Sequence, residues 1–291
     1  MTLFPEARRA LEQPAGTPVW DPAHDIVAAR ADNAAAAAAE PREVVADVRD
    51  VDAGGVPCRL YRPEGARDGV LVHLHGGGFV FHDVDVHDAA ARRLANRTRL
   101  TVLSVDYRRP PEHPFPAAPD DVSTVVGWLP GSGLAGPYAV HGDSAGGNLG
   151  LVAALRHPGF FSAAVLVYPF LEPRAGYPSY DLTGNGFDPR EADWYWRQYA
   201  ATEADLTDPD LAPLLSDRLG TLPPTLVVTA ELDPLRDEGE ELARRVAEAG
   251  VEVVSTRYQG QIHGFWRHAH VFPAAEQVLA QTAAFAARHL P

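Results

Sequence analysis

The chain has 291 residues, and 46% of them are hydrophobic, which is enough to fill a sizeable core in a single α/β domain. Its formal net charge is −14. A surface this acidic would repel phosphates, which argues against a nucleic-acid partner. No run approaches the roughly 18 consecutive apolar residues of a membrane span, and residues 1–13 lack the apolar core of a secretory signal. We therefore expect a cytoplasmic protein with no membrane partner.

The first part of the chain predicts a helix followed by a hairpin. Residues 28–39 are rich in alanine and have high helix propensity, and Pro41 ends that helix. The strand-like runs 44–51 and 56–61 are separated by Ala53-Gly54-Gly55, which is typical of a β-hairpin.

From residue 70 onward, short apolar runs alternate with helical patterns. The predicted strands are 70–75, 101–106, 138–141, 163–168, 225–229 and 251–258, and the predicted helices lie near 86–99, 117–129, 145–156, 236–249 and 274–290. Near-continuous apolar strands that alternate with helices indicate a buried, mostly parallel sheet covered on both faces. We predict one α/β domain over residues 1–291, with about eight strands and the hairpin as its antiparallel edge.

Residues 176–215 separate two predicted strands by far more than a usual loop. They contain a helix-like aromatic cluster, Trp194, Tyr195, Trp196 and Tyr199. A long insertion with its own secondary structure is typical of a lid or a binding element. We expect these aromatic side chains to form the core of that element, and the alternative is that they line a substrate pocket.

The sharpest motif is Gly142-Asp143-Ser144-Ala145-Gly146, a G-x-S-x-G between a predicted strand and a predicted helix. In that context the motif predicts a nucleophile elbow, a sharp turn that raises the serine hydroxyl above the sheet. The glycines are needed because the turn brings backbone against backbone. Ser144 then lies at a helix N-terminus, where an oxyanion is favoured.

A second motif, His75-Gly76-Gly77-Gly78, follows the predicted strand 70–75. Three successive glycines leave backbone N–H groups bare, and acyl transfer needs such donors at the developing oxyanion. We assign the N–H groups of Gly77, Gly78 and Ala145 to an oxyanion hole. His75 is interpreted as a structural residue that holds the loop.

An acid is expected after the strand 225–229. Asp233 is favoured because Pro234 then restarts the chain in a defined turn, and Glu231 is the alternative. Asp237 and Glu238 fall inside the following helix, where we expect a solvated position near its N-terminus.

A base is expected after the strand 251–258, where His263 lies on a loop bounded by glycines. The order Ser, Asp, His along the chain is the one expected for this fold. His263 must hydrogen bond the Ser144 hydroxyl, and Asp233 must fix its tautomer. Of the other histidines, His268 and His270 are rivals placed at the surface, while His73 and His141 are placed in the core of the sheet.

These motifs together resemble the hormone-sensitive-lipase-like esterases (family IV) of the α/β-hydrolase superfamily. The resemblance covers nearly the whole chain and depends on the segments 75–79, 111–118 with Tyr107, 142–148, 233–239 and 263–265. One departure is Arg108-Arg109-Pro110-Pro111, where the family usually has Arg-Leu-Ala-Pro. That difference concerns the packing of a supporting loop more than the reaction.

The resemblance implies a carboxylesterase for short- to medium-chain acyl esters, acting through an acyl-enzyme intermediate without a cofactor. It implies a helical cap built from about 1–43 and 176–215, a small-molecule ester as substrate, and a fold that allows a homodimer. We assign Phe79, Trp194, Tyr195 and Phe265 to the substrate pocket.

Other interpretations remain open from the sequence. An amidase, peptidase or acyltransferase would use the same three residues, since neither fold nor triad sets the leaving group. A non-catalytic ligand-binding protein on a hydrolase scaffold is a further alternative. The run from His82 to Asp88 contains potential metal ligands, but residues 85–94 are better interpreted as the start of a helix, so no metal is expected.

Overall fold

The computed structural model describes residues 2–12, 16–174, 176–182 and 186–290. Residues 1, 13–15 and 183–185, which belong to the two segments predicted to form a cap, lie outside the described residues, as do 175 and 291.

One eight-stranded sheet forms the centre of the protein, in the order β1-β2-β4-β3-β5-β6-β7-β8. The pairs β1/β2 and β2/β4 are antiparallel, and all other neighbours are parallel. The predicted fold class and the hairpin at the sheet edge are therefore confirmed. The strands are β1 (Asp47–Asp52), β2 (Pro57–Arg62), β3 (Val70–Leu74), β4 (Thr101–Val105), β5 (Tyr138–Asp143), β6 (Phe161–Val167), β7 (Thr225–Ala230) and β8 (Val253–Tyr258).

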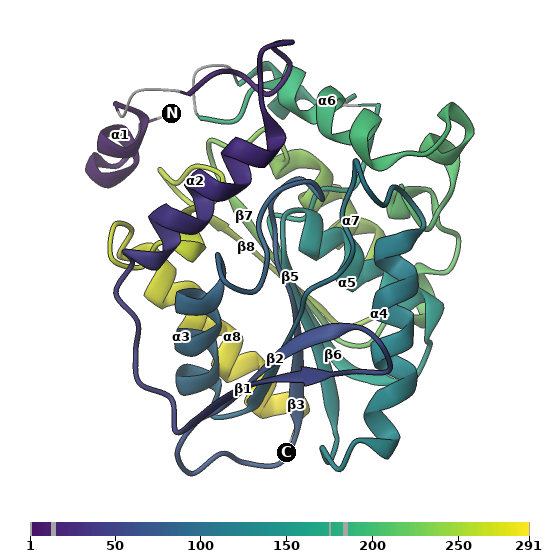
Figure 1. Ribbon diagram of the computed structural model, residues 1–291. Helices are drawn as coiled ribbons and strands as arrows, with labels where there is room; N and C mark the ends of the chain where they lie inside the picture. The colour runs from purple at the N-terminus through teal and green to yellow at the C-terminus, as the bar shows by residue number, and fades with distance from the viewer. Residues whose placement is uncertain (1, 13–15, 175, 183–185, 291) are drawn as a thin grey trace.

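Helices cover both faces of this sheet (Figure 1). One face carries α3 (Asp88–Thr98) and α8 (Ala274–His289), and the other carries α4 (Ala117–Trp128), α5 (Ala145–Arg156) and α7 (Arg236–Glu248). No helix in the described ranges combines the length and the apolar character that a membrane span needs.

Three further helices, α1 (Pro5–Leu11), α2 (Ile26–Ala38) and α6 (Pro189–Tyr199), lie beyond one end of the strands, with α2 and α6 at the top of Figure 1. The chain also contains short 3-10 helices, which are η1 (Leu129–Gly131), η2 (Pro178–Asp181), η3 (Glu203–Thr207), η4 (Pro213–Leu215), η5 (Leu219–Thr221) and η6 (Phe265–Arg267).

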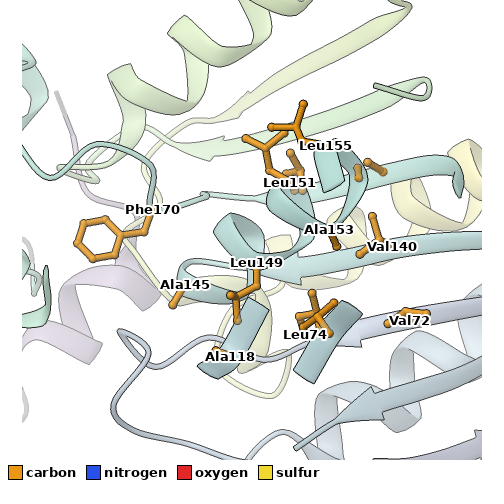
Figure 2. Close-up of a cluster of buried hydrophobic side chains, with 14 of the residues drawn as sticks. Val72, Leu74, Ala118, Val140, Ala145, Leu149, Leu151, Ala153, Leu155 and Phe170 are labelled. Atoms are coloured by element: carbon orange, nitrogen blue, oxygen red, sulfur yellow. The ribbon is translucent and has the colours of Figure 1, made fainter. Parts of the chain in front are cut away.

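The helix α5 is the central element of the core. All its residues from Ala145 to Leu155 are buried, as expected for a helix that is apolar on every side. Leu149 and Leu151 pack in one cluster with Leu74 of β3 and Val140 of β5 (Figure 2). Because β5 is an inner strand and leads directly into α5, the residue between them lies above the middle of the sheet.

Candidate active site

Ser144 occupies the sharp turn between β5 and α5. Its backbone has φ 55° and ψ −120°, a strained conformation for a residue other than glycine. The two glycines of the motif are required here: a Cβ on Gly142 would collide with the backbone of Gly146, and a Cβ on Gly146 would collide with the carbonyl of Leu74. The sequence motif therefore adopts the elbow geometry that it predicted.

The fold brings Ser144, His263 and Asp233 into one hydrogen-bonded chain. Nε2 of His263 lies 3.0 Å from Oγ of Ser144, and its Nδ1 lies 2.7 Å from Oδ2 of Asp233. The other carboxylate oxygen of Asp233 accepts from the N–H of Leu235 at 2.9 Å, which fixes the carboxylate. Asp233 follows β7 and His263 follows β8, so all three side chains lie at the carboxyl ends of parallel strands.

The electrostatic environment of His263 favours its protonated form. Burial disfavours the imidazolium, but the charge of Asp233 and the hydrogen bond to it outweigh burial, so the pKa of His263 is raised above its ordinary value. A base in this environment is well suited to take a proton from Ser144, because the imidazolium that results is stabilised.

The other three acidic candidates after β7 have structural partners, and Asp237 accepts from the N–H of Ser179 at 2.9 Å. Glu231, the alternative acid, accepts from the N–H of Gly260 at 2.8 Å and has no contact with His263 among the described hydrogen bonds. The expectation of a solvated Glu238 is wrong: this side chain is fully buried, accepts from the N–H of Leu171 at 2.7 Å, and accepts from the Tyr180 hydroxyl at 3.1 Å. Burial raises the pKa of Glu238 well above its usual range.

Amide donors lie beside Ser144. Gly77 and Gly78 have φ values of 118° and 58°, a conformation that glycine adopts without strain. In the part of the chain that the structure describes, neither of their N–H groups donates to a protein acceptor. Ala145 is the first residue of α5, and its N–H has no partner within the helix. The residues assigned to the oxyanion hole thus present unpaired donors.

The loop that carries these glycines is held from beneath. Asp143 accepts from the N–H of Gly76 at 3.0 Å, and the Tyr107 hydroxyl donates to the carbonyl of His75 at 2.7 Å. Arg109, where the sequence departs from the family motif, donates to the carbonyl of His82. His75 itself is fully buried and stacks on Tyr107, which agrees with its predicted structural role.

A cavity of about 380 Å³ opens above Ser144 and His263. One end is aromatic: Phe187 stacks on His263 at 5.1 Å and faces Tyr195 and Phe170 at 6.3 Å each. The remaining lining residues come from the N-terminal segment, from the loop after β3 and from the segment after β8; they are Val19, His24, Ala29, Asn33, Gly77, Gly78, Phe81, His82, Asp143, Tyr168, Gly264, Arg267 and His268.

Three of the four residues predicted to form the pocket wall do not line this cavity; only Tyr195 does. Phe79 is fully buried and stacks on Tyr199 at 3.8 Å. Phe265 is fully buried against Tyr258 at 5.4 Å. Trp194 stacks on Phe81 at 6.0 Å and so lies one layer behind the wall.

The lining residues missed by the sequence analysis, such as His24, Asn33, His82 and Phe187, carry no local pattern that indicates a cavity wall. They come from separate parts of the chain, and only His82 belongs to a pattern noted in the sequence, the run 82–88 of potential metal ligands. Only the packing of α2 and α6 over the sheet brings them together, so no sequence signal distinguished them.

Two groups of described residues bring three potential metal ligands together: Glu40 with His268 and His270, and His73 with His87 and Asp143. Both groups have other protein partners, because Glu40 forms an ion pair with Arg267 at 3.4 Å and Asp143 accepts from the N–H of Gly76 at 3.0 Å. Of the predicted metal-like run 82–88, Asp85 pairs with Arg59 and Asp88 begins α3.

Comparison with known proteins gives concordant results. Residues 71–267 match the model of a family described as having the alpha/beta hydrolase fold. The chain is 40% identical over 265 residues to the carboxylic ester hydrolase LipN of Mycobacterium tuberculosis, covering 83% of this chain and 70% of that protein.

Solved structures of esterases also superpose closely on this chain. The esterase of Pyrobaculum calidifontis superposes with a TM-score of 0.87 at 36% identity, covering 97% of both chains. An esterase from the bacterial hormone-sensitive lipase family superposes with a TM-score of 0.87 at 27% identity, covering 99% of both chains.

Proposed function

The chain belongs to the hormone-sensitive-lipase-like family of α/β hydrolases, and on that premise we propose that it is a serine carboxylesterase. The observation that carries the proposal is the hydrogen-bonded chain from Ser144 Oγ through His263 to Asp233, which ends beside three unpaired amide donors. No other arrangement among the described residues joins a nucleophile, a base and an orienting acid at the cavity.

In the proposed reaction, His263 Nε2 takes the proton of Ser144 as Oγ attacks the ester carbonyl carbon. The carbonyl oxygen becomes an oxyanion and accepts from the N–H groups of Gly77, Gly78 and Ala145. His263 then gives its proton to the leaving alkoxide, and an acyl-enzyme on Ser144 remains. Water repeats the sequence with His263 as base, which releases the acid and restores the serine.

We also propose that the segments 1–43 and 176–215 form a cap over this site. The support is that His24 and Asn33 from the first segment and Phe187 and Tyr195 from the second line the same cavity as Ser144. Its volume of about 380 Å³ lies near the lower end of the range for small-molecule sites. We therefore expect esters of short- to medium-chain acids as substrates. In a series of p-nitrophenyl esters, peak activity beyond about twelve carbons would contradict the small pocket.

The test of the proposed function is Ser144→Ala, with Ser255→Ala as its matched control. Ser255 is exposed on β8, away from the cavity. We expect Ser144→Ala to lower kcat for p-nitrophenyl butyrate on the order of 10⁴-fold or more and to abolish labelling by a fluorophosphonate probe. Ser255→Ala should match the unmodified protein in both assays. Wild-type turnover by the Ser144→Ala protein would refute the proposal.

A further inference from the structure

The cavity is lined by five polar side chains that the proposed reaction does not use, here called the polar wall. They are His24 and Asn33 from the N-terminal segment, His82 from the loop after β3, and Arg267 and His268 from the segment after β8. The apolar lining residues contributed by the N-terminal segment are Val19 and Ala29. Phe170, Phe187 and Tyr195 line the same cavity, which therefore offers both aromatic and polar contacts.

Two of these polar groups lack a protein partner. Nε2 of His24 is buried and has no hydrogen-bond partner among the described residues. The side-chain amide of Asn33 forms no hydrogen bond within the described part of the chain. A buried polar group without a partner is unfavourable, and native proteins keep few of them. A partner supplied by a bound molecule would satisfy the buried Nε2 of His24, and the partly exposed amide of Asn33 lies in the same cavity, available to the same molecule.

The orientation of His24 defines what kind of partner is missing. Its Nδ1 lies 3.1 Å from the carbonyl oxygen of Thr17, and its ring contacts Trp194 and Phe81 edge-on at 6.2 and 5.8 Å. A carbonyl oxygen only accepts, so Nδ1 carries the proton. In the neutral ring, Nε2 is then an acceptor, and its missing partner is a donor. A hydroxyl group is such a donor, whereas a carboxylate, a ketone or an ether is not.

The charges of the polar wall also favour a neutral ligand. Arg267 is the one permanently charged group of the polar wall, and Glu40 lies 3.4 Å from its guanidinium and 3.1 Å from His268. The protein as a whole carries a formal charge of −14. An anionic group would therefore meet no unbalanced positive charge here, while Asn33 can both donate to and accept from a neutral hydroxyl.

We propose that His24 and Asn33 form a subsite for a hydroxyl group, so that the enzyme takes esters whose acid or alcohol part is hydroxylated. This inference depends on the proposed esterase function, because it concerns the same cavity. The aromatic side chains would then contact the apolar part of the substrate, with the scissile carbonyl at Ser144.

The first experiment compares matched esters at pH 8 by titrating the released acid. Ethyl butyrate is the reference, ethyl 3-hydroxybutyrate carries the hydroxyl on the acid, glycerol monobutyrate carries it on the alcohol, and monoethyl succinate is the anionic analogue. We expect kcat/KM for at least one hydroxylated ester to exceed that for ethyl butyrate about tenfold, the effect of one or two net hydrogen bonds. Which ester it is identifies the half of the substrate that the subsite binds.

The second experiment measures the ratio of kcat/KM for the preferred hydroxylated ester to that for ethyl butyrate in His24→Leu and Asn33→Leu. The ratio should fall at least threefold in each variant, and because it is taken within one protein it is independent of the fraction that folds. Asp32→Ala is the matched control, since Asp32 is the exposed neighbour of Asn33 on α2 and does not line the cavity; its ratio should be unchanged.

Three results would overturn the subsite: ethyl butyrate hydrolysed as well as both hydroxylated esters, monoethyl succinate preferred over them, or both leucine variants with an unchanged ratio. In each of these, ethyl butyrate is still hydrolysed and the esterase function stands. A protein that hydrolyses none of the esters and fails to react with fluorophosphonate would instead remove both proposals together.

Discussion

Replacement of Asp233 by asparagine tests how the acid acts on the base. Asparagine has nearly the same shape, and its carbonyl oxygen can keep the hydrogen bond from Leu235. Its amide N–H₂ would then face Nδ1 of His263, where a carboxylate oxygen now lies at 2.7 Å. The imidazole would have to accept at Nδ1 and carry its proton on Nε2. An Nε2–H group 3.0 Å from Ser144 Oγ cannot take the serine proton.

The size of this effect follows from the buried ion pair. Asp233 is fully buried. Two unit charges about 4 Å apart attract by about 4 kcal/mol at an effective dielectric of about 20, and asparagine removes that stabilisation of the imidazolium. The wrong tautomer adds a further cost. A total of about 5 kcal/mol corresponds to a loss on the order of 10⁴-fold in kcat, in line with related triads.

The assay is steady-state hydrolysis of p-nitrophenyl butyrate by Asp233→Asn, with Glu231→Gln as the matched control. Glu231 is the neighbouring acid, and its carboxylate accepts from the Gly260 amide, away from His263. We expect kcat/KM of Glu231→Gln to stay within about tenfold of the unmodified enzyme. A small loss for Asp233→Asn together with a large loss for Glu231→Gln would show that the acid was assigned to the wrong residue.

Further expectations concern the pH profile and the stability of the fold. Burial raises the pKa of Glu191 to about 7, and its negative charge raises the pKa of His263, so Glu191→Gln should shift the acid limb of kcat/KM to lower pH; an unchanged or higher inflection would contradict this. Gly146→Ala should lower the free energy of unfolding by more than about 3 kcal/mol, because its methyl group would overlap the Leu74 carbonyl; a melting temperature within about 2 °C of the unmodified protein would refute this. Glu238→Leu leaves a buried backbone amide without an acceptor and should cost about 1–3 kcal/mol in urea unfolding. Glu238→Gln keeps an acceptor. The pKa of Glu238 is higher in the folded protein than in the unfolded chain, where it is about 4.5, so the unmodified protein loses stability as the pH rises above 4.5. The free energy of unfolding of Glu238→Gln relative to the unmodified protein should therefore increase from pH 5 to pH 8. A difference that stays constant over this range would show that Glu238 is charged in the folded protein.

The position of the helices and strands was predictable because both depend on local patterns. The helix over residues 145–156 agrees with α5, and the predicted strands agree with β3 to β8 within a few residues. The helix expected over 28–39 instead begins at Ile26, where the Asp25 side chain accepts from two backbone N–H groups, a capping signal that the alanine count did not use.

The polar side chains were less predictable because their environment is not local. The helical position of Glu238 suggested solvent, yet Tyr180, 58 residues earlier in the chain, covers it and hydrogen bonds it. Phe79 adjoins the glycine loop in sequence but points to Tyr199. In both cases the partner belongs to the long segment between β6 and β7, whose path over the sheet no pattern in the sequence defines.

By itself, the sequence determined the alternating α/β order, the turn at Ser144 and the glycine loop, because each results from steric limits or hydrogen bonding among residues close together in the chain. The contact of His263 with Ser144, 119 residues apart, was inferred from strand order, and only the folded chain shows its distance of 3.0 Å. The cavity wall was decided by tertiary structure alone. Its residues come from α2, α6 and several loops, and the volume that they leave between them depends on how those segments pack together.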